Sequence, residues 1–378
     1  MNGVITELHI GILGGGQLGR MLLQKAADFD LNIKVLDPDA DAPCRFLANE
    51  FVKGDFNDFD TVYSFGKKCD LLTIEIEHVN VDALEKLELE GITIYPQPAI
   101  IRLVQDKAAQ KEFYKQHDIP TAAFELVQNK KNISRSDFPF IMKSRTGGYD
   151  GKGVVKINSL QDIKEKAFDA PSIIEDVIPF VKELAVIVAR SPKGECKTYD
   201  VVEMEFNPEA NLVEFLFAPA DIADSIAEEA KNIAVDLIEK LNMIGLLAVE
   251  MFLTADNKLF VNEIAPRPHN SGHHTIEANS TSQYEQHLRA ILDLPLGNTV
   301  IIQPAVMINL LGEKGFTGNV RYENLDKAMM LGNVHPHLYG KKITKPFRKM
   351  GHVTVTADTL EEAKFIAKKV QQTIRVIS

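Results

Sequence analysis

The sequence contains no tryptophan and only three cysteines among its 378 residues. Cys44, Cys69 and Cys196 lie too far apart to form the close spacing of a metal-binding or redox motif. Scattered cysteines of this kind are typical of a reducing compartment, where they fill the core. The start of the chain also lacks the basic and then apolar pattern of a secretory signal. We therefore expect a cytoplasmic protein.

Long apolar runs and an excess of positive charge are absent as well. No apolar run approaches the roughly 18 residues of a membrane-spanning helix, so we expect no membrane segment. The net charge of −11 argues against a general attraction to nucleic acid or to an anionic membrane. A basic stretch at 341–349 could suit RNA, but the aromatic platform that stacks bases is missing. The remaining composition is that of a globular protein, and the length predicts two or three domains.

Strands and helices are expected to alternate over roughly the first hundred residues. The expected strands are 8–13, 33–36, 71–76 and 93–95, and the expected helices are 21–27, 58–68 and 81–89. Alternation of this kind predicts a parallel, doubly wound domain at 1–97. The fold class is therefore α/β.

The remainder of the chain mixes longer strands with isolated helices. The expected elements are a helix at 106–116, a strand–loop–strand–helix–strand segment at 124–179, strands at 183–190 and 197–205, a helix at 221–241, a hairpin at 246–264, strands at 305–311 and 352–356, and a helix at 359–370. A linker-like break lies at 293–297. We expect α+β architecture in this central region.

A glycine-rich loop follows the short strand expected at 138–142. It reads KSRTGGYDGKG over 143–153 and has four glycines within seven residues. Glycine backbone N–H groups can approach phosphate oxygens closely, and Lys143, Arg145 and Lys152 add positive charge. The loop therefore predicts a site for a polyphosphate, although such loops are also common as simple turns.

The hairpin at 246–264 carries a second indication of nucleotide chemistry. If Asp256 and Asn257 form a two-residue turn, Glu250 stands directly opposite Glu263. Like charges in that position repel each other, so they call for a cation between them. Mg²⁺ is usually held by one or two carboxylates together with substrate phosphates. The alternative is a solvated strand face that happens to be acidic, and a register slip by one residue would undo the pair.

The glycines near the N-terminus allow two interpretations. Gly14, Gly16 and Gly19 match the G-x-G-x-x-G pattern between a strand and a helix, and Asp37 ends the next strand. A nicotinamide-dependent oxidoreductase has this pattern. Such an enzyme would leave the second glycine loop and the paired glutamates unexplained. A single phosphate on the amides of Gly16, Gln17 and Leu18 at the helix start also satisfies the pattern. We favour the phosphate.

Two further groups of polar residues have ordinary explanations beside functional ones. His269 and His273 have the spacing of a helical zinc site, but the prolines and glycine around them oppose a helix. Glu75 and Glu77 lie at the end of an otherwise apolar strand, where they could be solvated or functional.

With these motifs in place, the chain resembles the ATP-grasp superfamily, and within it the 5-(carboxyamino)imidazole ribonucleotide synthetases. The resemblance covers essentially all residues and rests on segments in a consistent order. These are GGGQLGRM at 14–21, EIEHV at 75–79, KSRTGGYDGKG at 143–153, VNEIAPRPHNSGHHT at 261–275, HLRAILDLPLG at 287–297, YGK at 339–341 and RKMGH at 348–352. It implies three domains, at 1–97, 98–300 with a lid at about 122–182, and 301–378.

The resemblance implies a site for ATP and Mg²⁺. The residues at positions that would contact ATP are Lys107, Lys143, Gly148, Tyr149, Asp150, Gly151, Lys152, Gly153, Val154, Glu175, Asp176, Val177, Ile178, Glu183, Asn262 and Glu263. Within this set the strand at 175–178 would meet adenine, and Glu183 the ribose. Glu250 and Glu263 would hold the metal.

It also implies an acceptor site for bicarbonate and 5-aminoimidazole ribonucleotide. The substrate positions are Gln17, Leu18, Glu77, Tyr149, Asn270, Ser271, Lys341 and Arg348, and the catalytic positions are Asp150, Lys152, Arg267 and His269. The implied reaction is ATP-dependent carboxylation of an amine, and relatives suggest a homodimer. Other ATP-grasp ligases, such as a formate-using transformylase or a biotin-carboxylase relative, and the oxidoreductase remain as alternatives.

Overall fold

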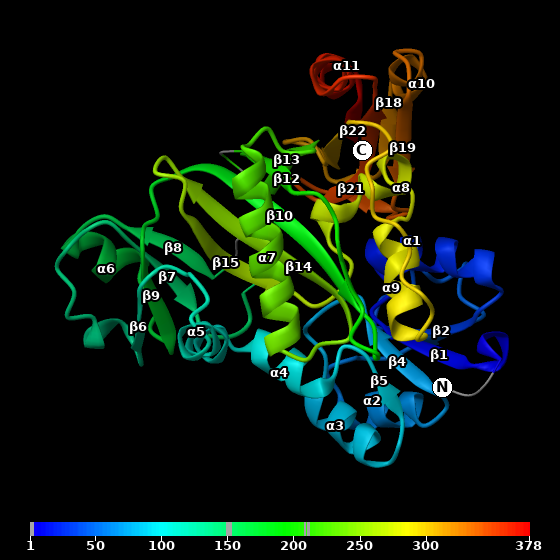
Figure 1. The fold of residues 1–378 in the computed structure, drawn as a ribbon, viewed down its shortest axis with the longest axis horizontal. Coiled ribbons are helices and arrows are strands. Elements are labelled where there is room, and N and C mark those ends of the chain that lie inside the picture. The colour runs from blue at the N-terminus through cyan, green and yellow to red at the C-terminus, as the bar shows by residue number, and fades with distance from the viewer. Residues whose placement is uncertain (1–3, 149–152, 208, 210–211) are drawn as a thin grey trace.

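The computed structural model describes residues 4–148, 153–207, 209 and 212–378. Three sheets organise this part of the chain: a parallel sheet at the N-terminal end, a long antiparallel sheet through the middle, and a small sheet at one side (Figure 1).

The N-terminal sheet has five parallel strands in the order β3-β2-β1-β4-β5. They are β1 (His9–Leu13), β2 (Asn32–Asp37), β3 (Glu50–Lys53), β4 (Leu71–Ile74) and β5 (Thr93–Ile94), and the helices between them are α1 (Gln17–Ala26), α2 (Phe59–Gly66) and α3 (Val81–Leu89). The doubly wound domain is confirmed. Strand β3 was not predicted, because this edge strand is short and has no fully buried residue.

The central sheet has nine antiparallel strands and runs in the order β15-β14-β10-β12-β13-β16-β21-β19, with β11 beside β10. Its strands are β10 (Phe180–Arg190), β11 (Cys196–Thr198), β12 (Val202–Asn207), β13 (Leu212–Ala218), β14 (Gly245–Thr254), β15 (Leu259–Ala265), β16 (Ala305–Leu311), β19 (Val334–Leu338) and β21 (Lys349–Thr356). The single strand expected at 197–205 is wrong. It is split because the buried Tyr199 turns into the core, where its hydroxyl donates to the Thr281 carbonyl over 3.1 Å.

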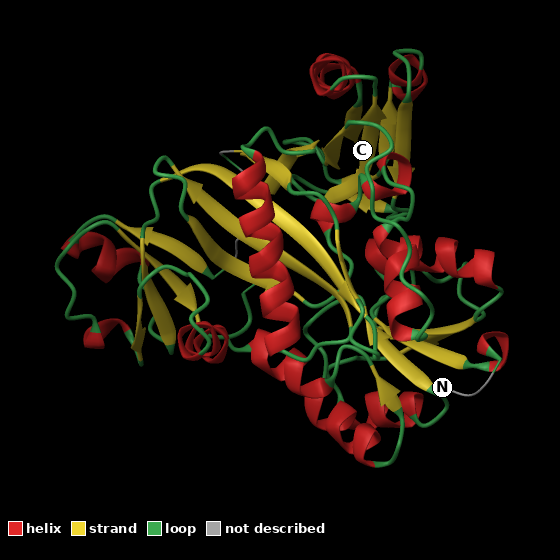
Figure 2. Cartoon of the chain, in the orientation of Figure 1, coloured by secondary structure: helices red, strands yellow, loops and turns green. Residues whose placement is uncertain are grey.

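Helix α7 (Asp224–Lys240) lies across one face of the central sheet (Figure 2). Ile226, Ala230, Ala234, Leu237 and Ile238 are buried along it, at the spacing of a single helical stripe. They pack on β10 and β14, the strands that carry Glu183 and Glu250. This packing gives the site a rigid floor.

The small sheet, at the position of the predicted lid, has the strand order β6-β9-β7-β8. Its elements are β6 (Phe124–Val127), β7 (Phe140–Ser144), β8 (Val154–Ile157), α6 (Leu160–Lys166) and β9 (Ser172–Asp176). Helices α4 (Pro98–Gln105) and α5 (Lys107–Gln116) lead into it from the N-terminal domain. The predicted helix at 106–116 is confirmed, and Asp106 caps it by accepting from the N–H of Ala108.

The C-terminal segment extends the central sheet, since β16 pairs with β13. The other elements are η1 (Ile5–Glu7), η2 (Ala27–Phe29), η3 (Lys130–Asn132), η4 (Asn270–Gly272), α8 (Thr275–Ala278), α9 (Gln283–Ile291), β17 (Gly318–Asn319), β18 (Arg321–Glu323), α10 (Leu325–Met329), β20 (Ile343–Thr344), α11 (Leu360–Thr373) and β22 (Arg375–Ile377). Within the described ranges, every helix is too short or too polar to cross a bilayer.

Candidate active site

The turn between β14 and β15 differs from the expected one. The N–H of Thr254 donates to the Lys258 carbonyl over 3.0 Å, so three residues, 255–257, form the turn rather than two. Asn257 closes it in the left-handed region, with φ of 62°. The strands leave this turn out of step with the predicted register by one residue, as the pairing of Leu253 with Leu259 shows.

A β-bulge lower in the hairpin restores the register. Met251 pairs with Val261, whereas Glu250 pairs with Glu263, so Asn262 is the extra residue of β15. A bulge redirects a side chain at a chosen point of a strand. Here it brings the two glutamates opposite each other, as predicted, and leaves Asn262 to accept a hydrogen bond from Lys143 over 3.0 Å.

The two glutamates form an unequal pair of acids. Burial raises the pKa of Glu250, and the neighbouring Glu263 adds to the shift. Lys107 lies 3.1 Å from the Glu263 Oε2 and holds the pKa of that carboxyl below its usual value. His269 approaches Glu250 on the other side, at 3.7 Å between Nε2 and Oε1. One of the two facing carboxyl groups is costly to ionise, and a divalent cation between them would favour its ionised form. Such a cation would take its further oxygen ligands from the substrate.

The predicted phosphate-binding lysine of the lid is held on two sides. Lys143, on β7, lies 2.8 Å from Glu175 Oε2 and donates to Asn262. Glu175 was expected on the adenine strand, but its buried side chain is turned towards Lys143 and Lys111. Although burial opposes it, these two lysines lower the pKa of Glu175. The predicted strand at 175–178 is only partly correct, because β9 ends at Asp176 and residues 177–178 lie in the connection to β10. Asp176 pairs with Arg135 at 2.5 Å.

The glycine loop joins β7 to β8, as expected. Gly148, Gly153 and Val154 belong to the described residues, whereas Tyr149, Asp150, Gly151 and Lys152 lie outside them. Gly153 has φ of 76°, and a Cβ there would come within 2.9 Å of Ser144 Oγ. A glycine is therefore required where the loop enters β8.

Near Lys107 and Lys143 lies a pair of residues whose contact the sequence did not predict. Arg145 forms a bidentate pair with Asp106, with the closest N···O distance at 2.7 Å. Asp106 also caps α5, the helix that begins with Lys107. This pair ties the loop to that helix. Arg145 was expected to add positive charge for a polyphosphate, and in the structure its guanidinium is paired with Asp106 instead.

Glu183, predicted at the ribose, lies on β10 next to Phe252 of β14. Burial raises the pKa of Glu183 to about 7. Its partner Phe252 is two residues from Glu250 on β14, so Glu183 and Glu250 lie on the same face of the sheet. The charge of Glu183 adds to the raised pKa of Glu250.

Several backbone N–H groups of the first glycine loop already donate to acidic side chains. Gly15 N donates to Asp37 Oδ2 over 2.7 Å, and Gly16 and Gly19 donate to the two oxygens of Glu75 over 2.9 and 3.0 Å. A Cβ on Gly16 would lie 2.5 Å from Glu75. A dinucleotide pyrophosphate needs these amides, so the arrangement opposes the oxidoreductase interpretation. Glu75 therefore binds amides and is not a solvated strand end.

Gln17 and Leu18 remain as the candidates for a phosphate at this helix start. They are the first two residues of α1, after the N-cap Gly16. The first N–H groups of a helix have no partner within it, and they carry partial positive charge. Arg20, one turn further on, was missed, and its guanidinium lies against Gly340, where a Cβ would come within 3.3 Å.

The C-terminal basic segment reaches the same end of α1. Lys342 pairs with Asp41 of the N-terminal domain at 2.7 Å. Lys341 donates to the Lys349 carbonyl over 2.9 Å, and Arg348 donates to the Ile343 carbonyl over 2.7 Å. The predicted phosphate residues of 339–348 and of α1 therefore lie near each other, although they are more than three hundred positions apart in the sequence.

The predicted acceptor residues follow the end of β15. Arg267 pairs with Glu77 at 2.8 Å, and His269 Nδ1 lies 2.9 Å from Ser271 Oγ. Asn270 exchanges two hydrogen bonds of 3.0 Å with Asn309 of β16, a residue that the sequence did not single out. One loop next to Glu250 thus brings together Glu77, Arg267, His269, Asn270 and Ser271.

The other histidines of this loop belong to the core. His273 stacks on His352 with ring centroids 4.5 Å apart, and its Nδ1 lies 3.0 Å from the Tyr284 hydroxyl. Burial lowers the pKa of His273, of His274 and of His352 below the usual range. These rings are neutral packing groups that join the loop to the C-terminal strands.

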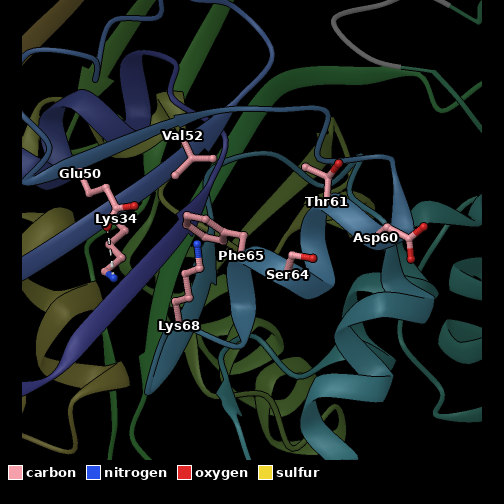
Figure 3. Close-up of a pocket in the computed structure, with 8 residues that line it drawn as sticks. All are labelled: Lys34, Glu50, Val52, Asp60, Thr61, Ser64, Phe65 and Lys68. Carbon is pink, nitrogen blue, oxygen red and sulfur yellow. Dashed lines mark ion pairs between the residues drawn. The ribbon is translucent and has the colours of Figure 1, made fainter.

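A hollow of about 350 Å³ lies elsewhere, on the N-terminal domain (Figure 3). Its lining residues are Lys34, Glu50, Val52, Asp60, Thr61, Ser64, Phe65 and Lys68. Lys34 and Glu50 neutralise each other at 3.2 Å. None of the predicted site residues lines it, so it has no part in the chemistry considered below.

Three domain families match the chain in order. They are a ribonucleotide synthetase preATP-grasp domain at 8–105, an ATP-grasp domain at 112–284 and a phosphoribosylaminoimidazole carboxylase C-terminal domain at 305–365. The chain also spans about two thirds, 64% to 67%, of the length of the first plant and fungal phosphoribosylaminoimidazole carboxylases that it matches.

Bacterial relatives and solved structures match the whole chain. An N5-carboxyaminoimidazole ribonucleotide synthase of Staphylococcus aureus is 38% identical over 94% of both chains. The synthetase structure from Thermotoga maritima covers 98% of this chain and 99% of its own, at 40% identity and a TM-score of 0.91. The synthase from Aspergillus clavatus, in complex with ADP and 5-aminoimidazole ribonucleotide, covers 97% of this chain and 98% of its own, at 35% identity and a TM-score of 0.89. The chain therefore belongs to the N5-carboxyaminoimidazole ribonucleotide synthetases, a family of ATP-dependent ligases within the ATP-grasp superfamily.

Proposed function

We propose that this chain carries out its family's reaction, the ATP- and bicarbonate-dependent carboxylation of the exocyclic amine of 5-aminoimidazole ribonucleotide. The observation that carries the proposal is the pairing of Glu250 with Glu263 between Lys107 and His269. Within one hairpin, the pair would connect the metal and phosphate site at Lys107 with the acceptor site at His269. The setting would be purine biosynthesis in the cytoplasm.

The nucleotide would lie between the lid and the central sheet. Lys107 and Lys143 would bind its phosphates, and Glu183 its ribose hydroxyls. Backbone groups at 175–178 would meet adenine, since the Glu175 side chain is engaged with lysines. Glu250 and Glu263 would hold Mg²⁺, which supplies charge neutralisation for the phosphoryl group when it is bound.

The acceptor would lie on the other side of the glutamate pair. Its phosphate would meet the amides of Gln17 and Leu18 together with Lys341 and Arg348. Glu77, Asn270 and Ser271 would position the imidazole and bicarbonate. Tyr149, Asp150 and Lys152 remain predicted members of this pocket.

The proposed reaction proceeds in two transfers. A bicarbonate oxygen attacks the γ-phosphorus in line, the bond to the β-phosphate oxygen breaks, and ADP and carboxyphosphate form. The amine then attacks the carboxyl carbon, directly or after release of CO₂, and inorganic phosphate leaves. Arg267 would bind the anionic intermediate, and His269 or Asp150 would take the proton from the amine. Carboxyphosphate is hydrolysed readily, so the lid must exclude water.

The test is ADP formation with each acceptor in turn. We expect it to need bicarbonate and 5-aminoimidazole ribonucleotide together, with one carboxylated product per ADP. Dependence on formate, or on a different amine, would instead identify another ATP-grasp ligase. We also propose that the protein is a homodimer, which light scattering would test.

A further inference from the structure

Lys111 is a buried lysine that the reaction outlined above does not use. It lies on α5, one turn after Lys107, and only 2% of its surface is exposed. Its ammonium lies 2.9 Å from Glu175 Oε1 and donates to Thr121 Oγ1 over 2.5 Å. Lysine is almost never fully buried without a partner, because an unpaired charge is costly to remove from water.

The contacts of Lys111 belong to a closed ring of polar groups. Thr121 donates to the Val261 carbonyl over 2.7 Å. On the other side, Glu175 reaches Lys143, which donates to Asn262, the residue next to Val261. The ring therefore starts and ends on β15, beside Glu263, and passes through α5 and two strands of the lid.

The ring contains two positive charges and one negative charge. Glu175 lies between Lys111 and Lys143, at 2.9 and 2.8 Å, and only 4% of it is exposed. One carboxylate cannot cancel both ammonium groups, so the cluster has a net charge of +1. Without Lys111, Glu175 and Lys143 would form a neutral pair, and a phosphate would meet little net charge.

We propose that Lys111 is a positioning residue for nucleotide binding: it satisfies Glu175 so that the charge of Lys143 remains available to the ATP phosphates. The proposal rests on the proposed function only in placing the phosphates at Lys143. Lys111 itself has no exposed surface to offer a ligand and acts through Glu175.

The electrostatic setting of Lys111 agrees with this role. Burial, together with the nearby charges of Lys143 and Lys107, lowers the pKa of Lys111 to about 8, while Glu175 opposes the shift. The Tyr114 ring also faces the ammonium, with its centroid 5.8 Å from Nζ. Lys111 is therefore charged at neutral pH and loses its proton above about pH 8, where the affinity for nucleotide should fall.

The test is calorimetric binding of MgADP, which needs no acceptor, to Lys111→Met and to the double variant Lys111→Met/Glu175→Gln. The single change should weaken binding about tenfold, since a charge near the phosphates is cancelled. The double change restores the net charge of +1 and should recover affinity to within about threefold of the wild type. Lys115→Met, on the exposed face of the same helix, is the matched control and should bind normally.

The outcomes separate this proposal from its alternatives. Unchanged affinity in Lys111→Met, or a double variant that binds as weakly as the single one, would overturn it, because a purely structural lysine gives no rescue. If Lys111→Met folds poorly, Lys111→Gln retains a hydrogen-bond donor without charge and takes its place. A wild-type protein that binds MgADP but makes no carboxylated product would refute the proposed function and leave the Lys111 test intact.

Discussion

Glu250 and Glu263 face each other across β14 and β15, although the turn that joins these strands is one residue longer than the simplest hairpin allows. The bulge at Asn262 compensates for the extra turn residue. Two departures from ideal geometry thus cancel, and they do so at the point where the carboxylates meet. Bulges are common beside active sites because they redirect side chains. The pairing of the two glutamates depends on this bulge.

The first prediction concerns the metal. Glu263→Gln should reduce Mg²⁺-dependent ADP formation by about 100-fold or more, because one of two protein ligands is lost. Steady-state ADP release with all substrates present is the measurement. Glu205→Gln, at an exposed position of β12, is the control and should retain activity. Near-normal turnover of Glu263→Gln would remove the metal assignment.

The same pair predicts how Mg²⁺ binding depends on pH. The pKa of Glu250 is raised, so the nucleotide-free protein retains a proton there that the unfolded chain has already lost. This group favours folding at low pH, and its contribution is lost as the pH rises towards the raised pKa. A metal ion displaces that proton, so Mg²⁺ affinity should increase with pH. Thermal shifts measured with Mg²⁺ from pH 6 upwards should grow in the wild type and stay flat in Glu250→Gln.

Much of the fold could be predicted because its signals are local. The alternation of short apolar strands and helices gave the N-terminal domain, and the apolar stripe of α7 gave the helix on the central sheet. The loop at 143–153 and the acidic hairpin were visible from residue type and spacing. In the hairpin the predicted two-residue turn was wrong, and the predicted pair was nevertheless correct because the bulge offset the error.

The groups that support the site could not be predicted, because their partners are distant in sequence. Glu75 caps the amides of Gly16 and Gly19 from another strand. Lys111 meets Glu175 across the boundary between α5 and the lid, and Asn309 of β16 meets Asn270 in the loop after β15. A single lysine or asparagine in a helix or strand has no pattern that distinguishes it from a solvated residue.

A second prediction follows from the buried neutral histidines. The pKa of His287 is lowered to about 3 by burial, and its Nε2 lies 2.9 Å from Thr73 Oγ1. A histidine with a lowered folded pKa takes up a proton only on unfolding, so stability is lost as the pH falls below its unfolded pKa near 6.5. Each such ring contributes a slope of up to about 1.4 kcal/mol per pH unit.

The measurement is urea unfolding between pH 5.5 and 7.5. His287→Gln should be less stable at neutral pH but should show a shallower loss on acidification, by about one proton. The partly exposed His335→Gln serves as the control and should follow the wild-type slope. An unchanged slope in His287→Gln would show that this ring does not titrate on unfolding.

A third prediction separates the acceptor phosphate site from the nucleotide site. Lys341→Met should raise the KM for 5-aminoimidazole ribonucleotide about tenfold, because the ion pair between this lysine and the substrate phosphate is lost. The KM for ATP should stay the same. Lys345→Met, on the exposed part of the same segment, should change neither. The riboside without phosphate should react equally slowly with the wild type and Lys341→Met. A selective loss with the riboside would place Lys341 away from the phosphate.

The fourth prediction concerns the amide pair between Asn270 and Asn309. In Asn309→Leu the half-buried amide of Asn270 loses both of its hydrogen bonds to the buried Asn309, at a cost of about 1–3 kcal/mol, and the loop that carries His269 is released from β16. Binding of the acceptor should weaken more than binding of ATP, and more carboxyphosphate should be lost to water. The ratio of ADP formed to carboxylated product measures this directly, and it should rise above one.

Asn319→Leu removes an exposed asparagine from β17 and provides the control, with the ratio expected to stay at one. Asn309→Asp tests the geometry further, since it keeps the size and one acceptor but loses the donor to Asn270. It should fall between the wild type and Asn309→Leu. If Asn309→Leu is destabilised but still forms one product per ADP, the pair supports only the fold. In that case the loop still excludes water from the intermediate and has kept its position.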